Sequence, residues 1–193
     1  MKEMLSITEL PNEKTTGIDI STALEIFKLF EAADEEIFSG YKEFSGFQSE
    51  YFTNQWNRAY QYIWEKIRHL GENPERNLKI ILSGAGTSGR IAMLVSRMFQ
   101  PFFQELFPGI SIDYLIAGGD LALIKAQEIA EDDPVQGIHD LKEILAGSEE
   151  FIYIGITCGF SANYVGGQLH YTAVEKKQPA FLIGFNPLER RDK

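Results

Sequence analysis

The most constraining feature of this sequence is a glycine-rich turn that joins a short apolar run to a helical pattern. The run covers residues 78–83, the turn covers 84–89, and apolar residues then recur at helical spacing over 91–99. A strand that passes through glycines directly into a helix places free backbone N–H groups and a positive dipole end at one point. Such a point binds anions, and Thr87 and Ser88 add two hydroxyl donors.

The same turn also matches the dinucleotide fingerprint through Gly84, Gly86 and Gly89. A nicotinamide site has an acid at the end of the second strand, whereas residues 117–119 at that point are Ala-Gly-Gly and Asp120 comes late. The Walker pattern is absent because no Lys-Ser/Thr pair follows the glycines. Two hydroxyls therefore favour a phosphate monoester, while a dinucleotide site and a purely structural turn stay open as alternatives.

Composition restricts the class of protein. The 193 residues are 44% hydrophobic, which suits one well-packed globular domain with an appendage. A net charge of −10 with no basic patch argues against nucleic-acid binding. Cys158 is the single cysteine, which is compatible with a reducing cytosol. Neither a signal peptide nor a membrane span of roughly twenty apolar residues is visible, so we expect a cytoplasmic protein.

No metal or cofactor is predicted. The three histidines lie far apart in the sequence, at positions 69, 139 and 170, without the spacing of a metal site. We interpret all three as surface or helix residues.

The first third of the chain predicts an irregular arm and two helices. Residues 6–20 look extended and polar, and Ser21 or Thr22 can cap a helix that keeps apolar spacing from 26 to 37. A second helix is predicted over 49–70. Its aromatic and apolar stripe is interpreted as core packing: Tyr60, Ile63, Trp64 and Ile67.

From residue 77 onward, strand and helix patterns alternate. Strands are predicted at 78–83, 111–116, 151–155 and 180–185. Such alternation favours a mostly parallel sheet covered on both faces, a three-layer αβα sandwich of the flavodoxin-like kind. We expect residues 1–76 to form an arm and helices that pack on a domain formed by 77–193. Ligands of such sheets bind where the strands end, here at 84–89, 117–120, 157–161 and 186–187.

The turn after the third predicted strand resembles the first in chemistry. Thr157, Gly159 and Ser161 again combine glycine and hydroxyls between a strand and a helix. If the two strands are neighbours, both turns can bind one phosphate. Cys158 lies in the turn, but with no partner histidine it is interpreted as an inert small residue.

Glu128 precedes three acidic residues and a proline, Glu131-Asp132-Asp133-Pro134. This pattern fits a solvated helix end, and it equally fits a carboxylate that accepts hydrogen bonds from sugar hydroxyls or transfers a proton. Both interpretations stay open.

Several of these segments together resemble one family over nearly the whole chain. Residues 84–90 (GAGTSGR), 115–119 (LIAGG), 128 and 131–132 are similar to the sugar isomerase (SIS) domains of N-acetylmuramic acid 6-phosphate etherases and the glucokinase regulatory protein. Residues 8–19 look like the etherases, whereas 155–162 (GITCGFSA), 167–169 and 183–187 look more like the regulatory protein. The resemblance implies that residues 77–193 are the first of two SIS copies.

Two departures separate the chain from the etherases. Where those enzymes carry a catalytic glutamate, eight residues past the arginine of the glycine turn, this chain has Met98. Methionine can neither protonate a leaving oxygen nor remove a proton. The etherases also place Ala-Ser-Gly-Arg-Thr where residues 157–161 are Thr-Cys-Gly-Phe-Ser. The resemblance therefore implies a relative that binds phosphosugars without converting them.

The hypothesis from the sequence is a phosphosugar-binding regulator of a sugar kinase, paired as a homodimer or with a second SIS domain. Its ligand would be of the fructose 6-phosphate, fructose 1-phosphate or N-acetylmuramic acid 6-phosphate type. Glu128 would contact the sugar, and the phosphate would lie on Gly86, Thr87, Ser88, Gly89, Thr157, Gly159 and Ser161. An etherase that uses Glu128, or an isomerase, is the alternative; the isomerase lacks a histidine at a strand end.

Overall fold

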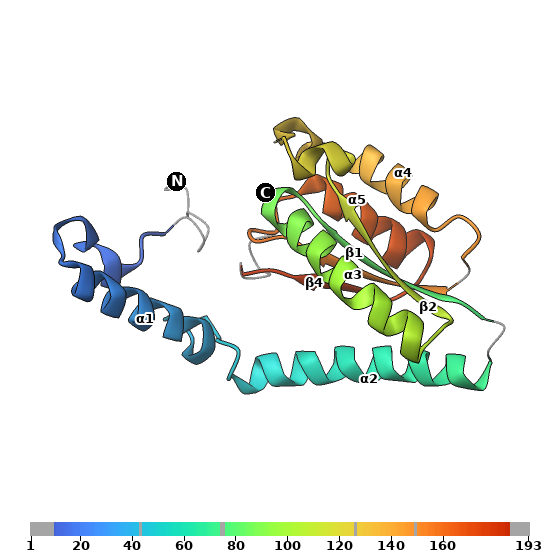
Figure 1. Ribbon diagram of the computed structural model, residues 1–193, viewed down its shortest axis with the longest axis horizontal. Coiled ribbons are helices and arrows are strands. Elements are labelled where there is room, and N and C mark those ends of the chain that lie inside the picture. The colour runs from blue at the N-terminus through green and yellow to red at the C-terminus, as the bar shows by residue number, and fades with distance from the viewer. Residues whose placement is uncertain (1–9, 43, 74–75, 126, 149, 186–193) are drawn as a thin grey trace. The chain divides into compact units, whose positions relative to one another are not determined.

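The computed structural model describes residues 10–185, apart from 43, 74–75, 126 and 149 (Figure 1). It contains two compact units that divide between Tyr62 and Ile63, within helix α2 (Glu50–Glu72). The predicted boundary between residues 76 and 77 stays a prediction.

The larger unit contains a four-stranded parallel sheet. Its strands are β1 (Leu78–Gly84), β2 (Ile110–Ile116), β3 (Glu150–Ile156) and β4 (Ala180–Ile183), in the order β2-β1-β3-β4. All four predicted strands are confirmed. The last is shorter than the predicted 180–185, because the Phe185 N–H donates to the carbonyl oxygen of Cys158 in the loop after β3 (3.0 Å).

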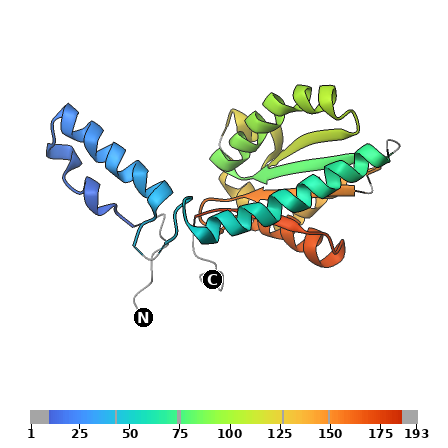
Figure 2. The same ribbon diagram turned by 90° about the horizontal axis from the view of Figure 1, so that it is seen from below.

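Helices cover both faces of this sheet, which confirms the three-layer αβα architecture. Helix α3 (Gly86–Leu106) packs on β1 and β2, while α5 (Asn163–His170) packs on β3 and against α4 (Pro134–Ile144). Figure 2 shows α3 in yellow-green on one face and α5 in orange-red on the other. Short turns complete the unit: η4 (Gly119–Leu123), η5 (Glu128–Asp132) and the π-helical η6 (Tyr171–Glu175).

Helix α3 approaches the sheet through small residues. Gly89, Ala92 and Ser96 are its buried positions, and the Ser96 hydroxyl donates to the carbonyl oxygen of Ile112 in β2 (3.0 Å). Of the apolar side chains over 91–99 whose spacing predicted this helix, Val95 is half-buried and the others are exposed: Ile91, Leu94, Met98 and Phe99. Phe102 and Leu106 are exposed as well. Their periodicity thus identified the helix but not its sheet-facing side, because small residues permit the closest packing on a sheet.

The smaller unit begins with two turns, η2 (Glu13–Thr15) and η3 (Ile18–Ile20), followed by α1 (Ala23–Ser39). Thr22, one of the two caps that the sequence predicted, caps α1 in a reciprocal capping box with Glu25. The extended conformation expected for residues 6–20 is wrong for 13–15 and 18–20. Lys14 holds this segment against α1, with its ammonium 3.1 Å from the Glu36 carboxylate. Residues 6–9 lie outside the described part.

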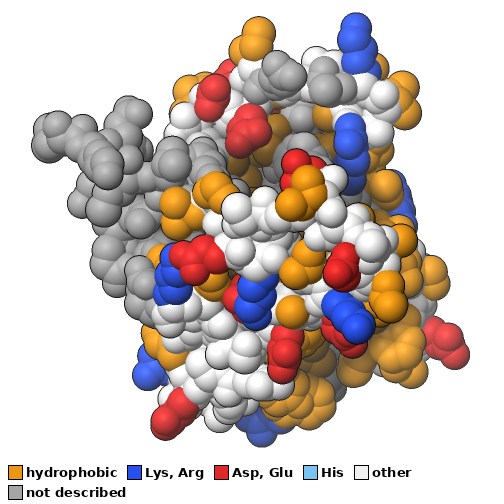
Figure 3. Space-filling model, turned by 90° about the vertical axis from the view of Figure 1, so that its left-hand side faces the viewer, with side chains coloured by type: hydrophobic (Ala, Val, Ile, Leu, Met, Phe, Trp, Pro, Cys, Tyr) orange, Lys and Arg blue, Asp and Glu red, His pale blue; other side chains and the backbone are white. Residues whose placement is uncertain are grey.

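The stripe on α2 corrects a second expectation. Tyr60 and Trp64 are 57% and 50% exposed, so their interpretation as core residues is wrong, whereas Ile63 and Ile67 are half-buried. Helical spacing places side chains on one face, but they are buried only where another element covers them. Exposed apolar side chains also lie among charged ones on the face shown in orange, red and blue in Figure 3.

No helix among the described residues combines the length and the apolar character that a membrane span requires.

Candidate functional site

The amino-terminus of α3 is the centre of the candidate site. Ala85 precedes the helix in an extended conformation (φ −116°, ψ 151°) and provides no side-chain cap. Gly86 has a φ of +53°, a left-handed value that favours glycine. Thr87 is exposed and Ser88 half-buried in the first turn. The first N–H groups of this 21-residue helix therefore have no side-chain cap, and they lie at the positive end of the helix dipole, where anions are stabilised.

Two further glycines hold this turn against the sheet. A Cβ on Gly89 would lie 2.5 Å from Cγ1 of Ile116, and one on Gly84 would lie 2.7 Å from the Gly89 nitrogen. The Ala117 N–H donates to the carbonyl oxygen of Gly84 (3.1 Å). The glycine pattern thus reflects close packing of β1, β2 and α3 as well as conformational freedom.

The second predicted turn leads from β3 into α5. Thr157 is buried and its N–H donates to the carbonyl oxygen of Ile183 (2.9 Å), while Gly159 is half-buried and Ser161 is exposed. Phe160 has a φ of +59°, which is uncommon for a residue with a side chain. As with α3, the residue before the helix, Ala162, makes no side-chain cap.

Strand order brings these two turns together. β1 pairs with β3, with Gly84 opposite Ile156 at their carboxyl ends. In the sheet, β2 lies on one side of β1 and β3 on the other. The order of strands therefore reverses between β1 and β3. Ligands of open α/β sheets bind at such a point. Both hydroxyl-bearing turns and both uncapped helix starts therefore lie at one edge of the sheet.

Other predicted site residues are placed less fully. Glu128 is the first residue of η5, but its side chain lies outside the description, as do Asn186 and Pro187. The histidines lie on α2, α4 and α5, none at the carboxyl end of a strand. Met98 lies on the exposed apolar side of α3, 65% exposed, so any residue at this position faces away from the sheet.

Sequence reasoning missed a buried polar network beneath the turns. The fully buried Gln168 of α5 accepts hydrogen bonds at Oε1 from the hydroxyls of Ser83 (2.5 Å) and Tyr153 (2.8 Å). Its amide nitrogen donates to the carbonyl oxygen of Gly137 in α4 (3.0 Å). Burial raises the pKa of Tyr153, which keeps the phenol a donor. This network joins β1, β3, α4 and α5, and its only sequence signal was a glutamine at a core-facing helix position.

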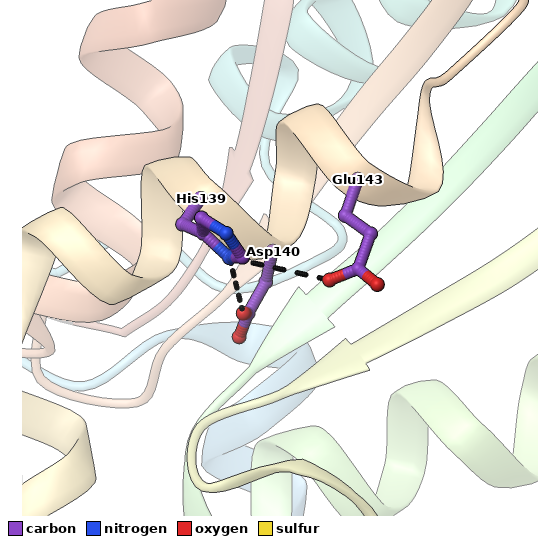
Figure 4. A group of neighbouring side chains, drawn as sticks. All are labelled: His139, Asp140 and Glu143. Atoms are coloured by element: carbon purple, nitrogen blue, oxygen red, sulfur yellow. Dashed lines mark ion pairs between the residues drawn. The ribbon is translucent and has the colours of Figure 1, made fainter.

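A second polar cluster lies on α4, where His139, Asp140 and Glu143 have ligand atoms within 4.8 Å of one another (Figure 4). His139 and Glu143 are 69% and 76% exposed. Asp140 already accepts hydrogen bonds from Tyr164 (2.7 Å) and Gln136 (2.6 Å). Burial raises the pKa of Tyr164, so its hydroxyl stays protonated in this contact. These bonds explain Asp140 as part of the packing of α4 on α5, and we assign the cluster no further role.

Comparison with known proteins identifies the family. The sequence model of the glucokinase regulatory protein N-terminal SIS domain matches residues 62–173. The chain belongs to this family of SIS domains. It is 34% identical to the glucokinase regulatory protein of Rattus norvegicus over 186 residues, which cover 94% of this chain and 29% of the relative. The relative from Xenopus laevis is 30% identical over 97% of the chain and 30% of its own length.

The etherases are also related. The N-acetylmuramic acid 6-phosphate etherase of Clostridium botulinum (strain Langeland) is 31% identical over 168 residues, 86% of this chain and 49% of the enzyme. The SIS chain therefore spans less than a third of the regulatory proteins and about half of the etherase. These similarities confirm the resemblance inferred from the sequence motifs.

Proposed function

We propose that this SIS chain binds a phosphosugar at the edge of the sheet where β1 and β3 end, and does so as a regulator of the glucokinase regulatory protein kind. The observation that carries the proposal is the pair of uncapped helix starts after two neighbouring strands. A phosphate monoester accepts hydrogen bonds from backbone N–H groups and hydroxyls without requiring a basic side chain. This suits a chain whose net charge is −10.

Calorimetry with fructose 6-phosphate, fructose 1-phosphate and N-acetylmuramic acid 6-phosphate tests the site. We expect saturable heat from at least one of them, which Ser88→Trp abolishes because the indole fills the space at the helix start. Ser45→Trp, at an exposed serine of the smaller unit, is the matched control. An absence of heat with all three ligands, or an equal effect of both variants, contradicts the proposal.

Catalysis is the second question, because the etherase relative shares the glycine turn. Met98 replaces the expected acid, and we propose that no ligand is converted. Incubation with N-acetylmuramic acid 6-phosphate, followed by an assay for lactate, tests this. Steady lactate release that Glu128→Gln abolishes would establish an etherase instead.

The regulatory part of the proposal concerns a sugar kinase as partner. It follows from the similarity to proteins named as regulators of glucokinase. We expect the protein in the cytoplasm. Affinity capture from a cytoplasmic extract, carried out with and without fructose 6-phosphate, tests for such a partner. Recovery of a sugar kinase that depends on the ligand supports a regulator. If no sugar kinase is recovered with or without the ligand, the chain binds the phosphosugar without regulating a kinase.

Pairing is the last part of the proposal. The exposed apolar side of α3, which includes Ile91, Leu94, Met98 and Phe102, exceeds what single scattered apolar residues explain. We expect a second SIS domain, in a homodimer or in the same protein, to cover it. Light scattering that shows a strict monomer at high concentration, with Leu94→Glu behaving like wild type, counts against pairing.

A further inference from the structure

A pocket at the opposite end of the sheet carries a second, independent inference. It has a volume of about 410 Å³, within the range of small-molecule sites. It lies at the amino-terminal end of β3, entirely inside the larger unit. Its lining residues are Lys142, Leu145, Ser148, Phe151, Tyr171, Lys176 and Gln178.

Two lysines converge on one aromatic ring in this pocket. The ammonium of Lys142 lies 4.8 Å from the centroid of the Tyr171 ring, and that of Lys176 lies 5.6 Å from it. Among the described residues, neither ammonium pairs with a carboxylate. Two like charges near one ring repel each other, and a bound anion would offset that repulsion. Among the described residues, the lining of the pocket includes these two lysines and no carboxylate, although the chain carries a net charge of −10.

The pocket wall also contains polar groups. Ser148 contributes a hydroxyl and Gln178 a side-chain amide, and both kinds of group form hydrogen bonds with ligand hydroxyls. The apolar surfaces of Tyr171, Phe151 and Leu145 provide contact for a carbon skeleton.

We propose that this pocket binds a small hydroxylated organic anion. The anionic group contacts the ammoniums of Lys142 and Lys176, and a hydroxyl of the ligand lies against Ser148 and the side chain of Gln178. The carbon chain lies against Tyr171. A phosphate ester and a carboxylate share this chemistry, and the probes below distinguish them. These contacts involve no residue of the phosphosugar site, which lies at the carboxyl ends of β1 and β3.

Nitrogen–proton correlation NMR tests the proposal through the side-chain amide signal of Gln178, assigned by its loss in Gln178→Leu. The probes are glycerol 3-phosphate, glycerate, inorganic phosphate and glycerol. We expect a saturable shift with glycerol 3-phosphate, glycerate or both, which identifies the anionic group, and none with neutral glycerol. Inorganic phosphate, which lacks a carbon skeleton, binds more weakly. No saturable shift with either organic anion overturns the proposal.

Variants separate a built site from general charge attraction. Lys142→Met together with Lys176→Met weakens binding about tenfold or more, since two charge-assisted contacts are lost. Lys28→Met, at an exposed lysine of α1, removes one of the same charges elsewhere and leaves the affinity unchanged. A similar loss with Lys28→Met overturns the proposal.

The phosphosugar site provides the last control. Ser88→Trp, which blocks that site, leaves the shift of Gln178 unchanged, so failure of one site is distinguishable from failure of the other. If Ser88→Trp removes the shift, the Gln178 signal reports the distant site and the second pocket is not a binding site.

Discussion

The helices of this chain begin in two different ways. α1 and α4 start with side-chain caps: Thr22 accepts from the Glu25 N–H, and Asp133 accepts from the N–H groups of Val135 and Gln136 (3.0 and 2.9 Å). α3 and α5 start after alanines, Ala85 and Ala162, which cannot cap. The uncapped starts follow β1 and β3, the neighbouring strands at the reversal of strand order.

The two kinds of start differ in whether the first backbone N–H groups of the helix have a side-chain acceptor or stay available as donors. A capped start has satisfied its first N–H groups internally, at a gain of about 1 kcal/mol. α3 and α5 lack that contribution and instead carry hydroxyls in or beside the first turn, on Thr87, Ser88 and Ser161. The comparison predicts that the uncapped starts bind anions and that the capped starts do not.

The largest effect is expected from filling the space at the uncapped start of α3. Gly89→Val lowers the free energy of unfolding by about 3 kcal/mol and removes phosphosugar binding, because its Cβ would lie 2.5 Å from Ile116. Urea denaturation measures the loss. Gly166→Ala in α5, where an added Cβ meets nothing within 4 Å, is the control and stabilises slightly. An unchanged unfolding midpoint for Gly89→Val would show that the turn can relax.

The next effect concerns the network that supports both uncapped starts. Gln168→Leu lowers the free energy of unfolding by about 2 kcal/mol, since the Ser83 and Tyr153 hydroxyls lose their acceptor and the Gly137 carbonyl loses a donor. Tyr153→Phe removes only one of these hydrogen bonds and costs about 1 kcal/mol. Thermal or urea unfolding of both variants measures this. Equal losses would mean that Gln168 contributes no more than its contact with Tyr153.

A direct exchange of the two kinds of helix start has a smaller effect. Ala85→Asp caps α3, which stabilises the free protein by about 1 kcal/mol. It weakens phosphosugar binding about tenfold or more, because a carboxylate now occupies the donors and repels the phosphate. Calorimetry and unfolding experiments measure the two effects.

Asp133→Ala is the reverse change on α4. It costs about 1 kcal/mol of stability and leaves binding unaffected. If Ala85→Asp stabilises the chain without weakening binding, the start of α3 does not hold the phosphate.

The smallest effect is expected at the amino-terminal end of β3, remote from both uncapped starts. The Lys66 ammonium, which donates to Glu150 (3.1 Å), lowers the pKa of this carboxyl, with a further contribution from Arg76. A pKa that is lower in the folded state gives stability that is present above the ordinary pKa of glutamate and is lost as the pH falls through the lowered value. Glu150→Gln therefore costs about 0.5–1 kcal/mol at neutral pH.

Urea denaturation as a function of pH tests this prediction. The difference in the free energy of unfolding between Glu150→Gln and wild type should vanish in acid. Phosphosugar affinity should not change, because Glu150 begins β3 whereas the uncapped starts lie at its other end. A difference that persists at low pH would show that packing rather than charge explains the loss.

Much of the fold could be predicted from local patterns. Residues 78–83 could be predicted as a strand because a short run of β-forming residues ends there at a glycine turn. The start of α1 could be predicted because Ser21 and Thr22 are both residue types that cap helices. The turn into α3 could be predicted at Gly86, because glycine adopts a positive φ without strain. Backbone geometry and local hydrogen bonding determine such features, and both depend on residues near in sequence.

Only the tertiary structure decided which residues meet. The pairing of β1 with β3, the burial of Gln168 and the convergence of Lys142 and Lys176 on Tyr171 depend on segments far apart in the chain. Exposure was equally beyond local reasoning. Trp64 keeps helical spacing yet is half exposed, because burial depends on whether another element covers a side chain, and helical periodicity carries no information about that neighbour.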